Sequence, residues 1–194
     1  MRYGKLVAAV CAAFLVGAVS AQEVGKPAPA FELPAAGASK VRLADLKGRV
    51  VLVDFWASWC APCKQSFPWM NDMQAKYGPK GLTIIGINVD KKREDADKFL
   101  VGTPAKFTVA FDSTGKVAEA YQPKGMPTSF LIGADGVVRA MHVGFREGDR
   151  EKLESELENK RLKLEDLSKY FFVPFCNFPI LIGEINHLKQ PKTK

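Results

Sequence analysis

The segment FWASWCAPCKQS, residues 55–66, contains two cysteines that are separated by two residues, Cys60 and Cys63. The whole chain holds 4 cysteines among 194 residues, so half of them lie in this one segment. Two thiols at this spacing support three kinds of chemistry: reversible disulfide exchange, part of a metal site, or a static disulfide. Each kind makes different demands on the residues around the pair.

Disulfide exchange needs a nucleophilic thiolate and a second thiol that can displace whatever the first one captures. Pro62 favours a helix that begins here, because proline is well tolerated in the first helical turn. Cys60 would then lie at the N-cap, where unpaired N–H groups and the helix dipole stabilise negative charge. Cys63 would lie one turn into the helix, within disulfide reach. The spacing therefore predicts Cys60 as the nucleophile and Cys63 as the resolving thiol.

The apolar run before the pair carries one acid, Asp54, in VLVDFW. A carboxyl group on a buried strand is either hydrogen-bonded or functional, because an unpaired buried charge is costly. Burial would also raise the pKa of this carboxyl, which would make Asp54 a proton acceptor for Cys63. The alternative is an aspartate that reaches water at a strand edge. The local pattern leaves both interpretations open.

Other uses of the cysteine pair find less support. A structural zinc site needs four ligands, and the sequence has no second such pair and only two distant histidines, His142 and His187; no metal site is predicted. A static disulfide that closes so small a loop would stabilise the fold poorly. A peroxidase is disfavoured because no Pro/Thr pattern precedes Cys60 and the cysteines are too close. The non-enzymatic alternative that stays open is a copper metallochaperone or thiol-dependent binding module using Cys60 and Cys63.

A second candidate region is Met126-Pro127-Thr128, just before an apolar run. A proline at a strand entry can follow a cis or a trans peptide bond, and local preference favours trans for Pro127. Close to the cysteines, Trp56 is expected in the core. Trp59, directly before the nucleophile, is expected to be a partly exposed contact for a partner.

The elements that must position these residues alternate between strands and helices. Residues 50–56 are apolar on both faces, which is typical of a central strand covered by helices. An Asp-Gly turn between two later apolar runs indicates a hairpin. The expected order is strand 50–56, helix 62–77 bent at Pro68, strand 81–90, helix 92–102, strand 107–112, helical turn 117–122, hairpin 128–143, and a charged helix over 149–167 with Leu153, Leu157, Leu164 and Leu167 on one stripe. This order predicts an α/β domain with a central mixed sheet flanked by helices.

Composition and charge limit the remaining function classes. The chain is 47% hydrophobic, which is enough for a core that does not depend on disulfides. The net charge is +7, but residues 22–160 hold 20 Lys/Arg against 18 Asp/Glu and are nearly balanced. No basic run interleaves with aromatic residues, so nucleic-acid binding is not expected.

The two ends of the chain differ from its middle. Residues 1–21 combine a basic start, an apolar run and the small residues VSA before Gln22. This pattern predicts a bacterial secretory signal peptide and a periplasmic protein, with an uncleaved membrane anchor as the alternative. Residues 161–194 form an atypical tail that is rich in aromatics and contains Cys176, a thiol without an evident partner. The expected division is a signal peptide over 1–21, a domain over 22–160 and the tail.

The run VVLVDFWASWCAPCKQSFP, together with the later GMPTSFLIGADGVV, resembles the thioredoxin superfamily, in particular its TlpA-like branch of extracytoplasmic thiol–disulfide oxidoreductases. The likeness covers roughly residues 25–157. It implies a thioredoxin-like fold with an N-terminal strand extension and an inserted αβ element after the second core strand. It also implies that Pro127 is cis and packs beside the disulfide, against the local expectation, and that the backbone of Met126 pairs with a client chain.

The same resemblance implies a function and partners. The Cys60–Cys63 pair would exchange with client protein cysteines in the periplasm as a reductant, as in cytochrome c maturation, with no cofactor beyond this redox-active disulfide. The implied partners are a client protein with cysteines or a disulfide and a membrane electron donor of the DsbD/CcdA type. The mature domain is expected to be a monomer. The expected client-binding residues are Trp59, Ala61, Pro62, Met126, Pro127 and Thr128.

Two positions depart from the pattern of the family. Many TlpA-like proteins have Asn where this chain has Asp54, whereas cytoplasmic thioredoxin has Asp, so the acid supports proton transfer from Cys63. Many also carry Glu near the position of Ser66, in a segment that here reads CKQSFP. The absence of that acid favours a broader or different client than cytochrome c maturation.

Overall fold

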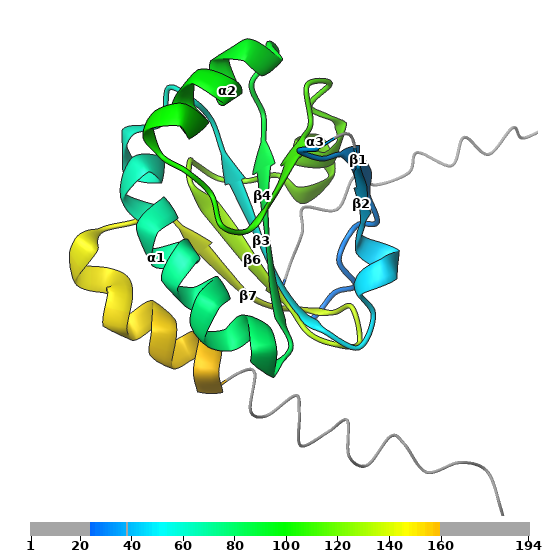
Figure 1. Cartoon of the computed structure of the whole chain (residues 1–194). Helices are drawn as coiled ribbons and strands as arrows, with labels where there is room; N and C mark the ends of the chain where they lie inside the picture. Colours follow the sequence, from blue (N-terminus) through cyan, green and yellow to red (C-terminus); the bar gives the residue numbers. More distant parts are fainter. Residues whose placement is uncertain (1–23, 38, 160–194) are drawn as a thin grey trace, which may run out of the picture.

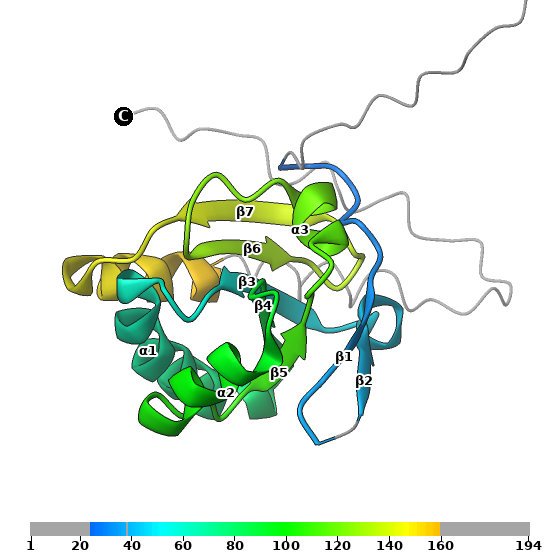
Figure 2. The same cartoon turned by 90° about the horizontal axis from the view of Figure 1, so that it is seen from above.

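The architecture is a central sheet with helices on both faces (Figures 1 and 2). The computed structural model describes residues 24–37 and 39–159. Within that part, five strands form the sheet in the order β5-β4-β3-β6-β7, and two more form a separate hairpin, β1-β2. The mixed sheet flanked by helices confirms the predicted α/β class.

Both strand directions occur in the main sheet. β3 pairs in parallel with β4, and β4 pairs in parallel with β5. On its other side β3 pairs with β6, and β6 with β7, both antiparallel. The strands are β3 (Val50–Trp56), β4 (Leu82–Asn88), β5 (Thr108–Phe111), β6 (Thr128–Ile132) and β7 (Val138–Val143). β3 is therefore central, and all seven of its residues are buried.

Side chains of β3 alternate between two hydrophobic clusters, one on each face of the sheet. Trp56 enters the cluster under α1 (Ala61–Tyr77), α2 (Arg93–Gly102) and the helical segment 150–159. Phe55 enters the opposite cluster, against α3 (Lys116–Tyr121). Short 3₁₀ helices complete the elements: η1 (Leu43–Leu46), η2 (Gly78–Lys80) and η3 (Glu147–Asp149).

The N-terminal residues cross the face of the sheet that carries α3, from one edge of the sheet to the other (Figure 2). The amide of Val138 on β7 donates to the carbonyl of Lys26, and the amide of Ala36 donates to the carbonyl of Val109 on β5. Between these points the chain forms the antiparallel hairpin of β1 (Glu32–Pro34) and β2 (Lys40–Arg42). This is the predicted N-terminal strand extension. The pair α2–β5, which follows β4, is the predicted inserted αβ element.

Most expected elements are present, with boundaries shifted by one to a few residues. α1 begins at Ala61 and contains Pro68. Leu153 and Leu157 of the charged helix are buried, as the leucine stripe predicted. Leu164 and Leu167, the signal peptide over 1–21, the tail over 161–194 and Cys176 lie outside the described residues, so these expectations stay predictions.

Gly86 on β4 provides a test of packing close to the site. It pairs with Asp54, and a Cβ there would meet Phe107 Cε2 at 2.8 Å and Trp56 Nε1 at 3.2 Å. We expect Gly86→Ala to lower the free energy of unfolding by about 1–3 kcal/mol in urea denaturation, as overpacked core substitutions do. Gly102→Ala is the matched control, because a Cβ there has nothing within 4 Å. Equal unfolding midpoints for the two variants would contradict this account of the packing.

Candidate active site

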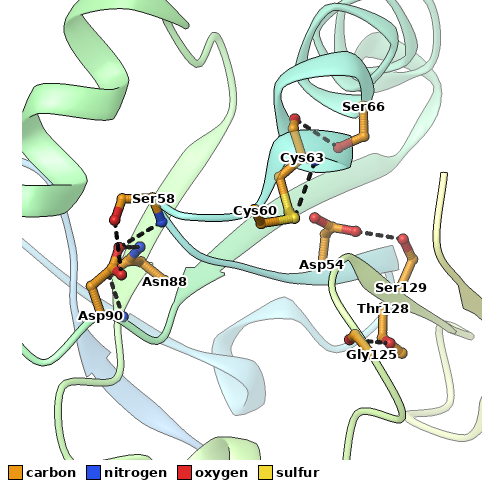
Figure 3. The surroundings of a disulfide bond; sticks show 10 residues. All are labelled: Asp54, Ser58, Cys60, Cys63, Ser66, Asn88, Asp90, Gly125, Thr128 and Ser129. Atoms are coloured by element: carbon orange, nitrogen blue, oxygen red, sulfur yellow. Dashed lines mark hydrogen bonds between the residues drawn. A yellow bond between two sulfur atoms is a disulfide. The ribbon is translucent and has the colours of Figure 1, made fainter.

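Cys60 and Cys63 form a disulfide at the start of α1 (Figure 3). Cys60 is the N-cap residue with extended backbone, and Pro62 lies in the first helical turn, as predicted. The Cα atoms of Cys60 and Cys63 are 5.3 Å apart, and the amide of Cys63 donates a hydrogen bond to Cys60 Sγ at 3.2 Å. A backbone N–H of the helix terminus therefore points at the first sulfur. Such a group stabilises negative charge on that sulfur once the pair is reduced.

The surface beside the pair is exposed although the sulfur-bearing residues are not. Cys60 is 3% exposed and Cys63 is fully buried, whereas Trp59 is 70% exposed. Ala61 and Pro62 are exposed as well. Trp56, in contrast, is buried in the core, so the structure separates the two tryptophans as the sequence predicted.

The turn that leads into Cys60 is held by an aspartate that follows β4. Asp90 Oδ2 accepts hydrogen bonds from the Ser58 amide at 2.8 Å and from Asn88 Nδ2 at 2.7 Å, and Asp90 Oδ1 accepts one from Ser58 Oγ at 3.0 Å (Figure 3). Asp90 is buried, so these bonds replace its contacts with water. Sequence reasoning missed this network, although the polar residues in INVD, directly after an apolar run, were its signal.

The Met126–Pro127 peptide bond is cis. The local expectation of a trans bond was therefore wrong, and the expectation drawn from the resemblance is confirmed. The intrinsic preference at an X–Pro bond is small, so the surrounding fold decides the isomer. Pro127 is buried, and Met126 is partly buried.

Thr128 lies differently from the other expected client-binding residues. Its side chain is completely buried, and Oγ1 donates a hydrogen bond to the carbonyl of Gly125 at 2.7 Å. The hydroxyl therefore fixes the turn that precedes β6. This places the Thr128 side chain inside the protein and leaves Trp59, Ala61, Pro62 and Met126 as the expected residues that reach solvent.

Asp54 is buried on the central strand, which excludes the strand-edge interpretation. Its Oδ1 accepts a hydrogen bond from Ser129 Oγ at 2.5 Å, and its Oδ2 is buried without a hydrogen-bond partner among the described residues. Burial raises the pKa of Asp54 from 3.8 to about 7, and the bond from Ser129 opposes this rise. Figure 3 shows the carboxyl group between Ser129 and the first turn of α1, with one oxygen turned away from Ser129. Asp54 can therefore gain and lose a proton near neutral pH.

A cavity of about 40 Å³ lies beside Asp54, between the sheet, α1 and the helical segment 150–159. Its polar walls are Asp54, Ser66, Ser129, His142 and Glu156, and the rest of its lining is mainly apolar. Sequence reasoning placed His142 in a strand, weighed it only as a metal ligand, and gave no role to Ser129 or Glu156. The hairpin pairing that brings Ser129 opposite His142 was the available signal.

The described part of the chain shows neither a metal cluster nor a membrane-spanning helix. Within residues 24–37 and 39–159, no three His, Cys, Asp or Glu side chains gather in a way that could hold a metal ion. None of the helices in the same part is both long and apolar enough to span a bilayer. His187 lies outside these residues.

The sequence pattern of the AhpC/TSA family matches residues 24–141, which include the N-terminal hairpin, both cysteines, the cis proline and most of β7. The chain belongs to the AhpC/TSA family. This match covers more than half of the chain; it ends within β7, before His142, and does not include η3 or the helical segment 150–159.

Curated relatives of this AhpC/TSA protein include thiol-disulfide oxidoreductases. The thiol-disulfide oxidoreductase ResA of Bacillus cereus (strain ZK / E33L) is 38% identical over 136 residues, which are 70% of this chain and 78% of that protein. ResA of Bacillus subtilis (strain 168) is 33% identical over 145 residues, covering 71% of this chain and 80% of the relative.

Similar solved structures are also thiol:disulfide interchange proteins. A DsbE-type thiol:disulfide interchange protein from Chlorobium tepidum is 52% identical, with a TM-score of 0.69, and the match covers 72% of this chain and 98% of that one. A thiol:disulfide interchange protein from Bacteroides sp. is 28% identical, with a TM-score of 0.61 over 71% of this chain and 91% of that one. The fold is thioredoxin-like, and the protein is a thiol–disulfide oxidoreductase, as the sequence predicted.

Proposed function

We propose that the protein reduces disulfides of client proteins in the periplasm, with Cys60 as the attacking sulfur, Cys63 as the resolving sulfur and Asp54 as the proton acceptor. The observation that carries this proposal is the position of the Cys60–Cys63 pair. It opens α1 beside an exposed Trp59 and next to a strand that carries a buried carboxyl group.

The proposed reaction transfers two electrons from the reduced pair to the client. The Cys60 thiolate attacks one sulfur of the client disulfide, which forms a mixed disulfide and releases the other client sulfur as a thiolate. Cys63 then gives its proton to Asp54 Oδ2 and attacks Cys60 Sγ. The second client sulfur leaves as a thiolate, both client thiolates take protons from water, and Cys60–Cys63 becomes the disulfide seen in the structure.

The buried carboxyl group supports the reducing direction. An ionised Asp54 next to the pair disfavours a negative charge on the sulfurs and so destabilises the reduced, thiolate-bearing form. A pair whose reduced form is less stabilised is the stronger reductant. The backbone N–H of Cys63, which donates to Cys60 Sγ, has the opposite effect: it stabilises a thiolate on Cys60 and so keeps this sulfur reactive.

The client would approach across the exposed side of the pair. Trp59, Ala61 and Pro62 offer apolar surface around the nucleophile. The backbone of Met126, before the cis Pro127, would pair with an extended client segment in antiparallel fashion. Thr128 would support that turn through its bond to Gly125.

Location, client and partners belong to the same proposal. The pattern of residues 1–21 and the relatives named ResA and DsbE support export to the periplasm. There, the client would be a protein with cysteines or a disulfide, of cytochrome c maturation or a similar process. A membrane protein of the DsbD/CcdA type would return electrons to Cys63–Cys60. The proposed redox centre is this pair alone, in a monomeric domain.

A measurement of the reduction potential tests the proposed direction. The protein is equilibrated in glutathione redox buffers, and its thiols are counted after alkylation. We expect a potential near that of thioredoxin, about −270 mV, because Asp54 disfavours the thiolate form. A potential of about −120 mV, which is typical of a strong oxidant, would overturn the proposed direction. Stoichiometric Cu(I) uptake without any disulfide turnover would instead favour the copper-binding alternative.

A further inference from the structure

A row of polar side chains runs across the face of the sheet that α1 covers, from the central strand to the edge strand. Asp54 on β3 pairs directly with Ser129 on β6, and Ser129 pairs directly with His142 on β7. Residues that lie opposite each other on neighbouring strands present their side chains to the same face, about 5 Å apart. β7 is the last strand of the sheet, and His142 is partly exposed. The row therefore links the buried carboxyl group to solvent.

The cavity beside Asp54 follows the same row. Asp54, Ser129 and His142 all line it, and its volume of about 40 Å³ has room for at least one water, which needs roughly 10–15 Å³. Asp54 Oδ2 has no hydrogen-bond partner among the described residues, which is the condition under which a buried water gains most. Ser66 Oγ, which donates to the carbonyl of Cys63, adds a further polar atom to this wall.

We propose that His142 exchanges the proton of Asp54 with solvent through water held in this cavity, and that it thereby returns Asp54 to its ionised form after each turnover. The inference rests on the proposed function, because it assigns the fate of the proton that Asp54 takes from Cys63. His142 acts through Asp54 and does not touch the sulfurs in this scheme, so it is a positioning residue for proton transfer.

The proton balance closes without any further reactant. Resolution by Cys63 leaves Asp54 as a neutral carboxylic acid. Its proton passes from Oδ2 to the water and from the water to a ring nitrogen of His142, and the ring then releases a proton to solvent. Burial raises the pKa of Asp54 to about 7, so the carboxyl group can both take up and give up its proton near neutral pH.

The elements packed around Asp54 present few other titratable groups. α1 contributes Cys63, with Ser66 and otherwise apolar side chains on the cavity wall. The helical segment 150–159 contributes Glu156, which lines the cavity and is partly exposed. Glu156 is therefore the competing route by which a proton could leave, and the test must separate it from His142.

The experiment measures proton exchange at Asp54 directly, in the oxidised protein, from the line shape of its ¹³C-labelled carboxyl group near the titration midpoint. We expect His142→Gln and His142→Ala to slow the exchange by about tenfold, less than the ~10²-fold of a proton-transfer group in direct contact. Added imidazole should restore the rate in His142→Ala, which leaves space for it. Met141→Ala, the neighbouring residue on the opposite face, should exchange as fast as wild type.

Two results would overturn the inference. One is exchange in both His142 variants that is as fast as in Met141→Ala. The other is slow exchange in Glu156→Gln with normal exchange in His142→Gln, because the proton would then leave through Glu156. This readout needs no client and no turnover, so the inference can fail while the proposed function stands. Native two-dimensional NMR spectra of each variant establish that it is folded.

Discussion

Cys60→Ser is expected to abolish the reduction of insulin disulfides by dithiothreitol that the wild-type protein catalyses. The hydroxyl of serine is not ionised at neutral pH, so the attack on a disulfide sulfur that opens the proposed reaction cannot occur. Loss of a nucleophile costs enzymes several orders of magnitude, and we expect a fall of at least about 10³-fold. Turbidity from the precipitating insulin B chain reports the rate.

Cys63→Ser is the matched control for this result. It keeps the sulfur at the N-cap of α1 and removes the one that resolves the mixed disulfide. We expect this variant to accumulate a stable mixed disulfide with a client peptide, visible by mass spectrometry, whereas Cys60→Ser forms none. Turnover by Cys60→Ser at the wild-type rate, or an adduct on its Cys63, would reverse the assigned roles of the two cysteines.

Asp54→Asn is expected to slow resolution of the mixed disulfide and to remove the inflection near pH 7 from its pH profile. In wild type the ionised carboxyl group accepts the proton of Cys63, so the rate should rise with pH through the pKa of Asp54, about 7. The amide cannot accept this proton, and the rate at pH 8 should fall by about 10²-fold. Rapid mixing of the reduced protein with a disulfide peptide at several pH values gives the profile. A profile in Asp54→Asn that keeps the wild-type rates and the inflection near pH 7 would remove Asp54 from the proposed mechanism.

The same substitution should make the protein more stable. An acid whose pKa is raised from 3.8 to about 7 in the folded state holds a proton that the unfolded state has lost between those values. Wild-type stability therefore falls as pH rises from about 4 to 7 and stays low above that range. At pH 8 we expect Asp54→Asn to exceed wild type by on the order of a few kcal/mol in urea unfolding, with the difference shrinking toward pH 4. A less stable variant at pH 8 would show that burial does not dominate at this carboxyl group.

Local sequence signals were sufficient to predict the strands, the helices and the position of the Cys60–Cys63 pair at the start of a helix. The uniform apolar run of β3 and the Asp-Gly turn of the β6–β7 hairpin determine their own elements. The N-cap position of Cys60 follows from the proline two residues later. These features depend on neighbours in the chain, which is why a single sequence reveals them.

The features that sequence reasoning missed join residues that are distant in the chain. Ser58 and Asp90 meet because β3 and β4 end at the same edge of the sheet. Ser129 reaches Asp54 across 75 positions, and His142 joins the row only through the strand register. The isomer at Pro127 is likewise set by the fold around it and not by its local preference.

The segment that crosses the sheet has a consequence for how the domain assembles. Lys26 and Ala36 bond to the two outermost strands, so the first residues of the domain complete contacts with some of its last. Contacts between such distant positions form slowly, and until they form, both borders of the sheet offer unpaired backbone to other chains. A protein that lacks this N-terminal segment would retain Cys60, Cys63 and Asp54, and we expect its first defect to be aggregation.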